Sequence, residues 1–272
     1  MSETFDVQPM TGRIGAEIFG VDLTKPLSNR EVGQIHDTLT EYQVIFFRDQ
    51  KLDHESHQRL AGHYGEIVKP FGKSVEGFPG IGRHHVDETS DHVAGDMWHT
   101  DHSCDEIPPM GTILYMHTVP KHGGDTLFSS MYAAYDALSD RMKAHLEGLT
   151  AVHDGPQVYA RYYGREKTDG KYPINSHPVI GIHPASKKKF LFVNAQYTTK
   201  INGLSPAESS ALLRYLNEHC ADAAFQVRFR WRPHSIAFWD NLATQHYAIW
   251  DYFPQVRSGF KAVISGQKFA MA

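Results

Sequence analysis

Cysteine is scarce in this chain of 272 residues, which contains only Cys104 and Cys220. Two cysteines are too few for a disulfide framework. The start of the chain lacks the basic and apolar regions of a signal peptide. No stretch approaches the ~18 consecutive apolar residues that a membrane span needs. We therefore expect a cytoplasmic protein that is not embedded in a membrane.

An excess of charge of either sign is also missing. The net charge is −4 and the isoelectric point is about 6.5. A nucleic-acid-binding surface would require clustered positive charge, so we expect no nucleic-acid partner. No internal repeat, low-complexity tract or flexible linker divides the sequence, and we predict a single domain over residues 1–272.

Helices are predicted at three places. Ser28 with Glu31, and Ser205 with Glu208, form capping boxes ahead of apolar residues spaced three and four apart. A third helix is predicted over residues 131–147, ended by a glycine.

Short strand-like runs fill much of the remaining chain. They lie at residues 44–47, 111–116, 178–183, 190–193, 225–231, 235–239 and 259–264. Residues 178–193 read as a hairpin that turns at 184–189. Many short strands with few helices predict a mostly β fold with flanking helices, namely a β-sandwich or jelly roll.

The segment around His99 and Asp101 is the strongest candidate for chemistry. On an extended strand, residues i and i+2 face the same way, so both side chains can bind one ion. His246 is the candidate for a third ligand. Two histidines and one carboxylate on one side of an ion leave adjacent positions open, as in non-haem Fe(II) oxygenases.

The pattern His-x-Asp is weak on its own, because the chain contains two similar ones. His85-Val86-Asp87 lies in a polar stretch that we interpret as a loop. His145-Leu146-Glu147 lies on a predicted helix, where residues i and i+2 do not face each other. Neither is expected to bind the metal.

The wider pattern identifies a family. The matching segments are residues 15–18 (GAEI), 20–23 (GVDL), 43–48 (QVIFFR), 98–101 (WHTD), 108–109 (PP), 123–126 (GGDT), 133–138 (AAYDAL), 191–194 (LFVN), 239–241 (WDN) and 245–246 (QH), followed by Arg257. In this order they resemble the taurine dioxygenase / 2,4-dichlorophenoxyacetate dioxygenase family of Fe(II)/2-oxoglutarate enzymes. The resemblance implies a double-stranded β-helix (jelly roll) core, with His99, Asp101 and His246 as Fe(II) ligands.

The same resemblance implies that Thr126 and Arg257 bind the co-substrate 2-oxoglutarate. A guanidinium can pair with the distal carboxylate through two parallel hydrogen bonds, and the threonine hydroxyl can donate another. Trp98 and Trp239 are expected to pack the core. Asp240 or Asn241 is expected to hold the loop that carries the third ligand.

Substrate-binding positions depart from the taurine enzymes. Lys261 stands where those enzymes have an arginine for the sulfonate, and Lys69 or Pro70 stands where they have a histidine. Gly95 replaces an asparagine, and the pocket aromatic is kept as Tyr197. A lysine still binds anions as a point charge. Taurine itself is therefore not the expected substrate.

The expected function is oxidation of a C–H bond in a small molecule that carries a carboxylate or sulfonate, with O₂ and 2-oxoglutarate consumed. Along a strand, Arg257 and Lys261 face the same cavity. A buried ammonium there needs an anion, which we expect the substrate to supply. Two alternatives remain open: a zinc hydrolase with the same three ligands, and a non-catalytic jelly-roll binding protein. The sequence leaves open a homo-oligomer.

Overall fold

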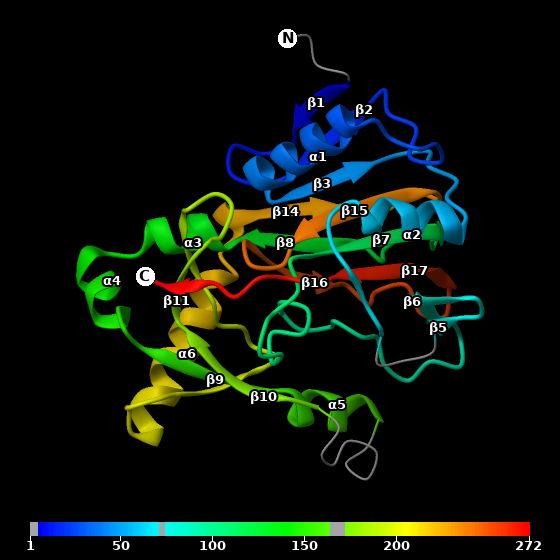
Figure 1. Cartoon of the computed structure of the whole chain (residues 1–272). Helices are drawn as coiled ribbons and strands as arrows, with labels where there is room; N and C mark the ends of the chain where they lie inside the picture. The colour runs from blue at the N-terminus through cyan, green and yellow to red at the C-terminus, as the bar shows by residue number, and fades with distance from the viewer. Residues whose placement is uncertain (1–4, 71–73, 164–171) are drawn as a thin grey trace.

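A computed structural model describes residues 5–70, 74–163 and 172–272 (Figure 1). The helices are α1 (Asn29–Tyr42), α2 (His54–Gly62), α3 (Met131–Ala137), α4 (Asp140–Leu146), α5 (Gly155–Tyr163) and α6 (Pro206–Cys220), with a short 3-10 turn η2 at Ala223–Phe225. The strands of the first half are β1 (Asp6–Pro9), β2 (Ala16–Phe19), β3 (Val44–Phe47), β4 (Ile67–Val68), β5 (Ser74–Val75), β6 (Phe78–Val86), β7 (Gly111–Thr118) and β8 (Thr126–Ser130). Those of the second half are β9 (Thr150–Asp154), β10 (Ile174–Pro178), β11 (Ile180–Ile182), β12 (Lys189–Leu191), β13 (Thr198–Ile201), β14 (Gln226–Phe229), β15 (Ser235–Asp240), β16 (Thr244–Ala248), β17 (Arg257–Ile264) and β18 (Ala270–Met271).

Two sheets form the centre of the molecule. The larger has the strand order β1-β2-β3-β15-β7-β17-β6-β5, with β4 also pairing with β17, and the smaller has the order β14-β8-β16. Aromatic side chains fill the space between them: Phe46 of β3 stacks on Phe229 of β14 with ring centroids 3.9 Å apart, and Trp239 of β15 packs on Phe128 of β8. The predicted jelly-roll core is confirmed.

Helices α1 and α2 cover the outer face of the large sheet (Figure 1). Ile35, Leu39 and Leu60 from these helices are buried against sheet residues such as Ile113 and Phe238. The capping box at the start of α1 is present as predicted, and so is the one at the start of α6. Each cap satisfies backbone N–H groups that the first turn leaves free.

The prediction of one continuous helix over residues 131–147 is wrong, because two shorter helices occupy this stretch. Leu138 is extended after α3, and the Ser139 side chain accepts a hydrogen bond from the Met142 backbone to begin α4. A serine in mid-segment competes with the helix by capping a new one. The apolar spacing alone did not reveal this break.

Two further three-stranded sheets, β10-β9-β13 and β12-β11-β18, complete the described structure. The predicted hairpin over residues 178–193 is confirmed, with β11 and β12 paired antiparallel. The thiols of Cys104 and Cys220 are both buried and free. Within the described ranges, no helix is long and apolar enough to cross a membrane.

Candidate active site

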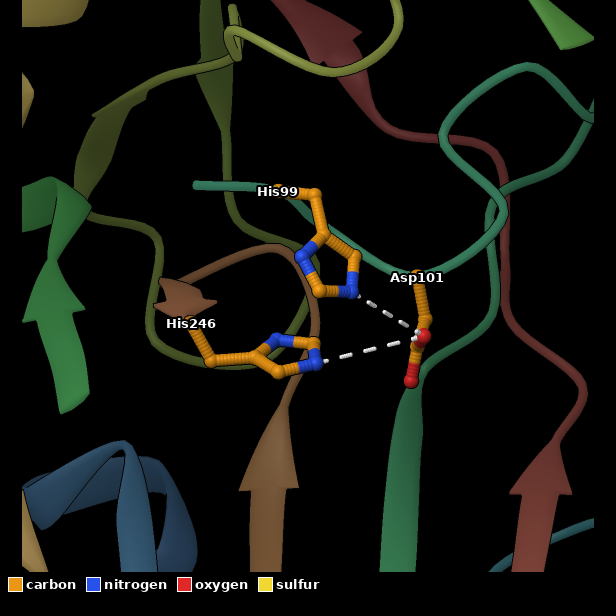
Figure 2. Close-up of side chains that lie close together, drawn as sticks. All are labelled: His99, Asp101 and His246. Carbon is orange, nitrogen blue, oxygen red and sulfur yellow. Dashed lines mark ion pairs between the residues drawn. The ribbon is translucent and has the colours of Figure 1, made fainter. Parts of the chain in front are cut away.

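His99, Asp101 and His246 meet inside the jelly roll (Figure 2). His246 lies on β16, and His99 pairs with it through two backbone hydrogen bonds of 2.8 and 3.1 Å. The Asp101 Oδ1 atom lies 3.7 Å from His99 Nε2 and 4.0 Å from His246 Nε2. His99 forms an isolated bridge rather than a regular strand, but both side chains still converge as predicted.

The three donor atoms are suited to one metal ion. All lie within 4.8 Å of one another, and the three residues are buried. An ion with ligand bonds of about 2.0–2.2 Å can span the two separations from Asp101. Burial, and next the neighbouring His99, lower the pKa of His246 well below its usual value, which keeps the ring neutral and able to coordinate.

A chain of hydrogen bonds fixes the Asp101 carboxylate from behind. Its Oδ2 accepts a hydrogen bond of 2.9 Å from the Thr112 hydroxyl, and Asn241 Nδ2 donates to that hydroxyl. The indole of Trp239 donates to Asn241 Oδ1 in turn. Oδ1 is therefore left to face the two imidazoles, as outer contacts around metal ligands typically arrange.

Of the two residues expected to hold the loop before His246, Asp240 makes the contacts within that loop. Asp240 Oδ1 accepts the backbone N–H groups of Leu242 and Ala243, and its Oδ2 lies 2.9 Å from His183 Nε2. Asp240 thus shapes the turn between β15 and β16. Asn241 acts on the Asp101 side instead.

His99 is held in one orientation. Its Nδ1 lies 2.8 Å from the Met97 carbonyl oxygen, which can only accept, so Nδ1 carries a proton and Nε2 is the ring nitrogen that faces Asp101. Gly95 lies beside this ring with φ +88°, and a Cβ there would be 2.9 Å from His99 Cε1. The replacement of the family's asparagine by glycine therefore matches the close approach of the ring.

Lys261 points into the site from β17, and its Nζ lies 3.1 Å from Asp101 Oδ1. Burial by itself would raise the pKa of the Asp101 carboxyl, but Lys261 and the two histidines outweigh it and hold that pKa well below its usual value. The anion that meets this ammonium in the structure is Asp101. This corrects the expectation that the substrate has to supply it.

A cavity of about 220 Å³ opens beside the three donors. Its polar side includes Arg257, Lys261 and Thr126, and its apolar side includes Leu114 and Val263. Arg257, Lys261 and Val263 alternate along β17 and all reach the cavity, as the period of a strand requires. The sequence-based expectation for Arg257 and Lys261 matches this arrangement.

Arg257 is 2% exposed, and no carboxylate of the described residues lies within 4.0 Å of its guanidinium. Its Nη1 donates to His84 Nε2 at 2.7 Å, and its Nε has no hydrogen-bond partner among the described residues. Burial lowers the pKa of Arg257 to about 10, so the group stays charged near neutral pH. Thr126 accepts from the Trp231 indole and keeps its own hydroxyl hydrogen for another partner.

Of the remaining predicted residues, some line the cavity and others lie outside it. Tyr197 lines the cavity, and its hydroxyl donates to Tyr159 at 3.4 Å. Lys69 is exposed and is not among the lining residues, whereas the neighbouring Pro70 is. Trp98 is half-buried and packs against Tyr247 instead of entering the core.

The two similar motifs lie away from the three donors. Residues 83–86 of the polar stretch belong to β6, so the loop interpretation is wrong there and holds only from Asp87 onward. The His85 ring contacts Ser258 and Asp87. His145 is on α4 and does not line the cavity.

Sequence reasoning missed four residues of the site: His84, Thr112, Tyr159 and the role of Gly95 beside His99. Period-two alternation places His84 opposite in direction to His85, and this signal was available once β6 was recognised as a strand. Thr112 and Tyr159 depend on contacts between distant segments.

The fold and the site together define a class, since a jelly roll with two histidines and one carboxylate is typical of non-haem iron dioxygenases. The chain matches the family model "Taurine catabolism dioxygenase TauD, TfdA family" over residues 6–261. It belongs to this family. The protein is therefore an enzyme, a dioxygenase that depends on 2-oxoglutarate and uses Fe(II).

Particular relatives extend this result. The chain is 34% identical to an alpha-ketoglutarate-dependent sulfate ester dioxygenase of Pseudomonas putida, over 96% of this chain and 90% of the relative. It is 29% identical to the alpha-ketoglutarate-dependent 2,4-dichlorophenoxyacetate dioxygenase of Cupriavidus pinatubonensis, over 88% of this chain and 90% of the relative. A crystal structure of a taurine dioxygenase from Burkholderia xenovorans superposes with a TM-score of 0.87 at 33% identity, covering 99% of this chain and 92% of that one.

Proposed function

We propose that this enzyme hydroxylates a C–H bond of a small substrate bearing one carboxylate, sulfonate or sulfate group. O₂ and 2-oxoglutarate are consumed, and succinate and CO₂ are formed. The names of the relatives support an anionic substrate, because sulfate esters, 2,4-dichlorophenoxyacetate and taurine all carry such a group. The cavity supports it as well, since three cationic side chains line it: Arg83, Arg257 and Lys261.

In this proposal His99, Asp101 and His246 hold Fe(II). The metal, when bound, supplies the activation of O₂ that the protein's own side chains cannot provide. The protein contributes orientation and exclusion of water. The hydrogen bond from Thr112 keeps Asp101 Oδ1 directed at the metal position.

Arg257 and Thr126 bind the distal carboxylate of 2-oxoglutarate. A buried guanidinium without an ion-pair partner is costly unless an anion meets it. This buried, unpaired cation beside the three metal donors is the observation that carries the proposal. A zinc hydrolase would need the same three donors but has no use for such a cation.

Lys261 and Tyr197 contact the primary substrate. Lys261 is one-third exposed and can turn between Asp101 and an incoming anion without being stranded in an apolar environment. Tyr197, Tyr159 and Leu114 offer apolar surface to the remainder of the molecule. Lys69 is exposed and outside the cavity, and Arg83 lines the cavity but is exposed, so Lys261 is the less exposed cation available for the substrate anion.

A substrate panel tests the proposal. Alkyl sulfonates, alkyl sulfate esters and aryloxyacetates are compared with neutral amides and amines of the same size, and succinate is measured with and without O₂. Succinate formation should require O₂ and should be stimulated by the monoanions. A best substrate that is neutral or cationic, or turnover that continues without O₂, would refute it.

Substitution of Lys261 tests the contact. In Lys261→Ala, the KM for the anionic substrate should rise about tenfold or more, because a hydrogen bond to a charged group is worth about 1.5–3 kcal/mol, while the KM for 2-oxoglutarate changes little. Lys200→Ala, at an exposed position outside the cavity, is the matched control. Equal changes in both KM values would show that Lys261 acts through Asp101 and not on the substrate.

A further inference from the structure

The guanidinium of Arg257 rests on a histidine from the neighbouring strand. His84 lies on β6 and lines the cavity, and its Nε2 is 2.7 Å from Arg257 Nη1. This is a short distance for an N–H···N contact between side chains. Among the described residues, the partner of the Arg257 guanidinium is therefore a histidine and not an aspartate or glutamate.

The direction of this hydrogen bond is determined by the chemistry of the two groups. Arginine offers only donors, so His84 Nε2 must accept and the imidazole must be neutral with its proton on Nδ1. Burial, then the charges of Arg257 and Lys261, lower the pKa of His84 to about 3. The ring is therefore a neutral acceptor near neutral pH.

The strand register fixes the pair. Across β6 and β17, His84 is opposite Gly259, and Arg257 is opposite Val86. The two side chains are thus diagonal neighbours on one face of the sheet, within reach of each other. Gly259, the residue opposite His84, carries no side chain, and a Cβ there would collide with the Tyr115 carbonyl oxygen.

A neutral acceptor has a consequence that a carboxylate would not have. It fixes the guanidinium by a hydrogen bond while leaving its positive charge uncompensated. A carboxylate at this place would neutralise Arg257 and repel another carboxylate. The nearby Asp125 forms an ion pair of 2.7 Å with Arg228 and acts on Arg257 only from beyond contact distance, so the Arg257 guanidinium has no ion-pair partner among the described residues.

We propose that His84 is a positioning residue that holds Arg257 through a neutral hydrogen bond, so that the guanidinium is oriented and fully charged for the distal carboxylate of 2-oxoglutarate. This rests on the proposed role of Arg257. His84 need not touch the primary substrate or the reacting atoms.

Three variants test the proposal by calorimetric titration of 2-oxoglutarate into the Mn(II)-loaded protein without O₂. His84→Leu removes the acceptor, and affinity should fall about tenfold, within the range for a hydrogen bond to a charged group. His84→Gln keeps an acceptor oxygen and should stay within about threefold of wild type by the same scale. His84→Glu supplies an internal anion and should bind 2-oxoglutarate less tightly than His84→Leu.

His85→Leu is the matched control, because the adjacent ring contacts Ser258 and Asp87 and should leave 2-oxoglutarate affinity unchanged. In steady-state assays His84→Leu should raise the KM for 2-oxoglutarate and leave kcat at saturation and the KM for the primary substrate nearly unaltered. Thermal unfolding of each variant checks that the fold is retained.

The outcomes separate the two proposals. If Arg257→Ala binds 2-oxoglutarate as tightly as wild type, the assignment of Arg257 fails and this inference fails with it. If Arg257→Ala is impaired but His84→Leu binds normally, only the role of His84 is overturned. Equal losses in the leucine and glutamine variants, or a change confined to the KM for the primary substrate, would also overturn it.

Discussion

Removal of the Arg257 guanidinium should weaken 2-oxoglutarate binding about ten- to a hundredfold. The side chain is 2% exposed and has no carboxylate partner among the described residues, so little of its charge is screened by solvent. In Arg257→Ala a bound distal carboxylate would lose charge-assisted hydrogen bonds worth about 1.5–3 kcal/mol, and each 1.4 kcal/mol is about tenfold in affinity. His84 Nε2 would lose its donor as well.

The assay is anaerobic titration with Fe(II) bound, followed by the weak visible charge-transfer band of a chelated keto acid. Arg257→Lys should recover only part of the loss, because an ammonium is a point charge and cannot form the bidentate pair. Arg214→Ala, on the exposed face of α6, is the control for loss of one positive charge. An unchanged affinity in Arg257→Ala would show that another group holds the distal carboxylate.

Further variants address the metal site. His99→Ala or Asp101→Ala should abolish Fe(II) binding and turnover with the fold retained, whereas His85→Ala should bind Fe(II) normally; the reverse result by metal analysis would refute the ligand assignment. Thr112→Val should lower metal affinity about 10–100-fold, as loss of such outer contacts typically does, and unaltered affinity in a chelator competition would contradict its role. Gly95→Ala should destabilise the protein by about 1–2 kcal/mol, because φ is positive there, and thermal unfolding checks this.

The three residues proposed to bind the metal could be grouped from the sequence because each signal was local or followed a known order. His99 and Asp101 are two residues apart, and His246 follows a recognisable segment of the family pattern. Strand periodicity then placed Arg257 and Lys261 toward one cavity, as the structure has them. These inferences need only the direction of side chains within one element.

What could not be read from the sequence depends on pairing between elements. The contact of His84 with Arg257 exists because β6 and β17 pair in one register, and a slip of one residue would bring His85 to that face instead. The hydrogen bond from Thr112 to Asp101 likewise joins β7 to a loop. Lys69 was predicted to bind substrate because it aligns with a substrate-binding histidine of the taurine enzymes, but it lies outside the cavity.

The charges around the cavity bear on the substrate. Lys261 forms an ion pair with Asp101, whereas Arg257 has no ion-pair partner among the described residues. Arg83 also lines the cavity, but it is exposed to solvent and is left out of this balance. A divalent metal would raise the total to three positive charges, of which 2-oxoglutarate compensates two. One remains, and a buried site with uncompensated charge is costly. On the proposed assignment a monoanionic substrate would neutralise the site, so we predict that sulfonates and sulfate monoesters bind more tightly than dianionic phosphate monoesters of equal size.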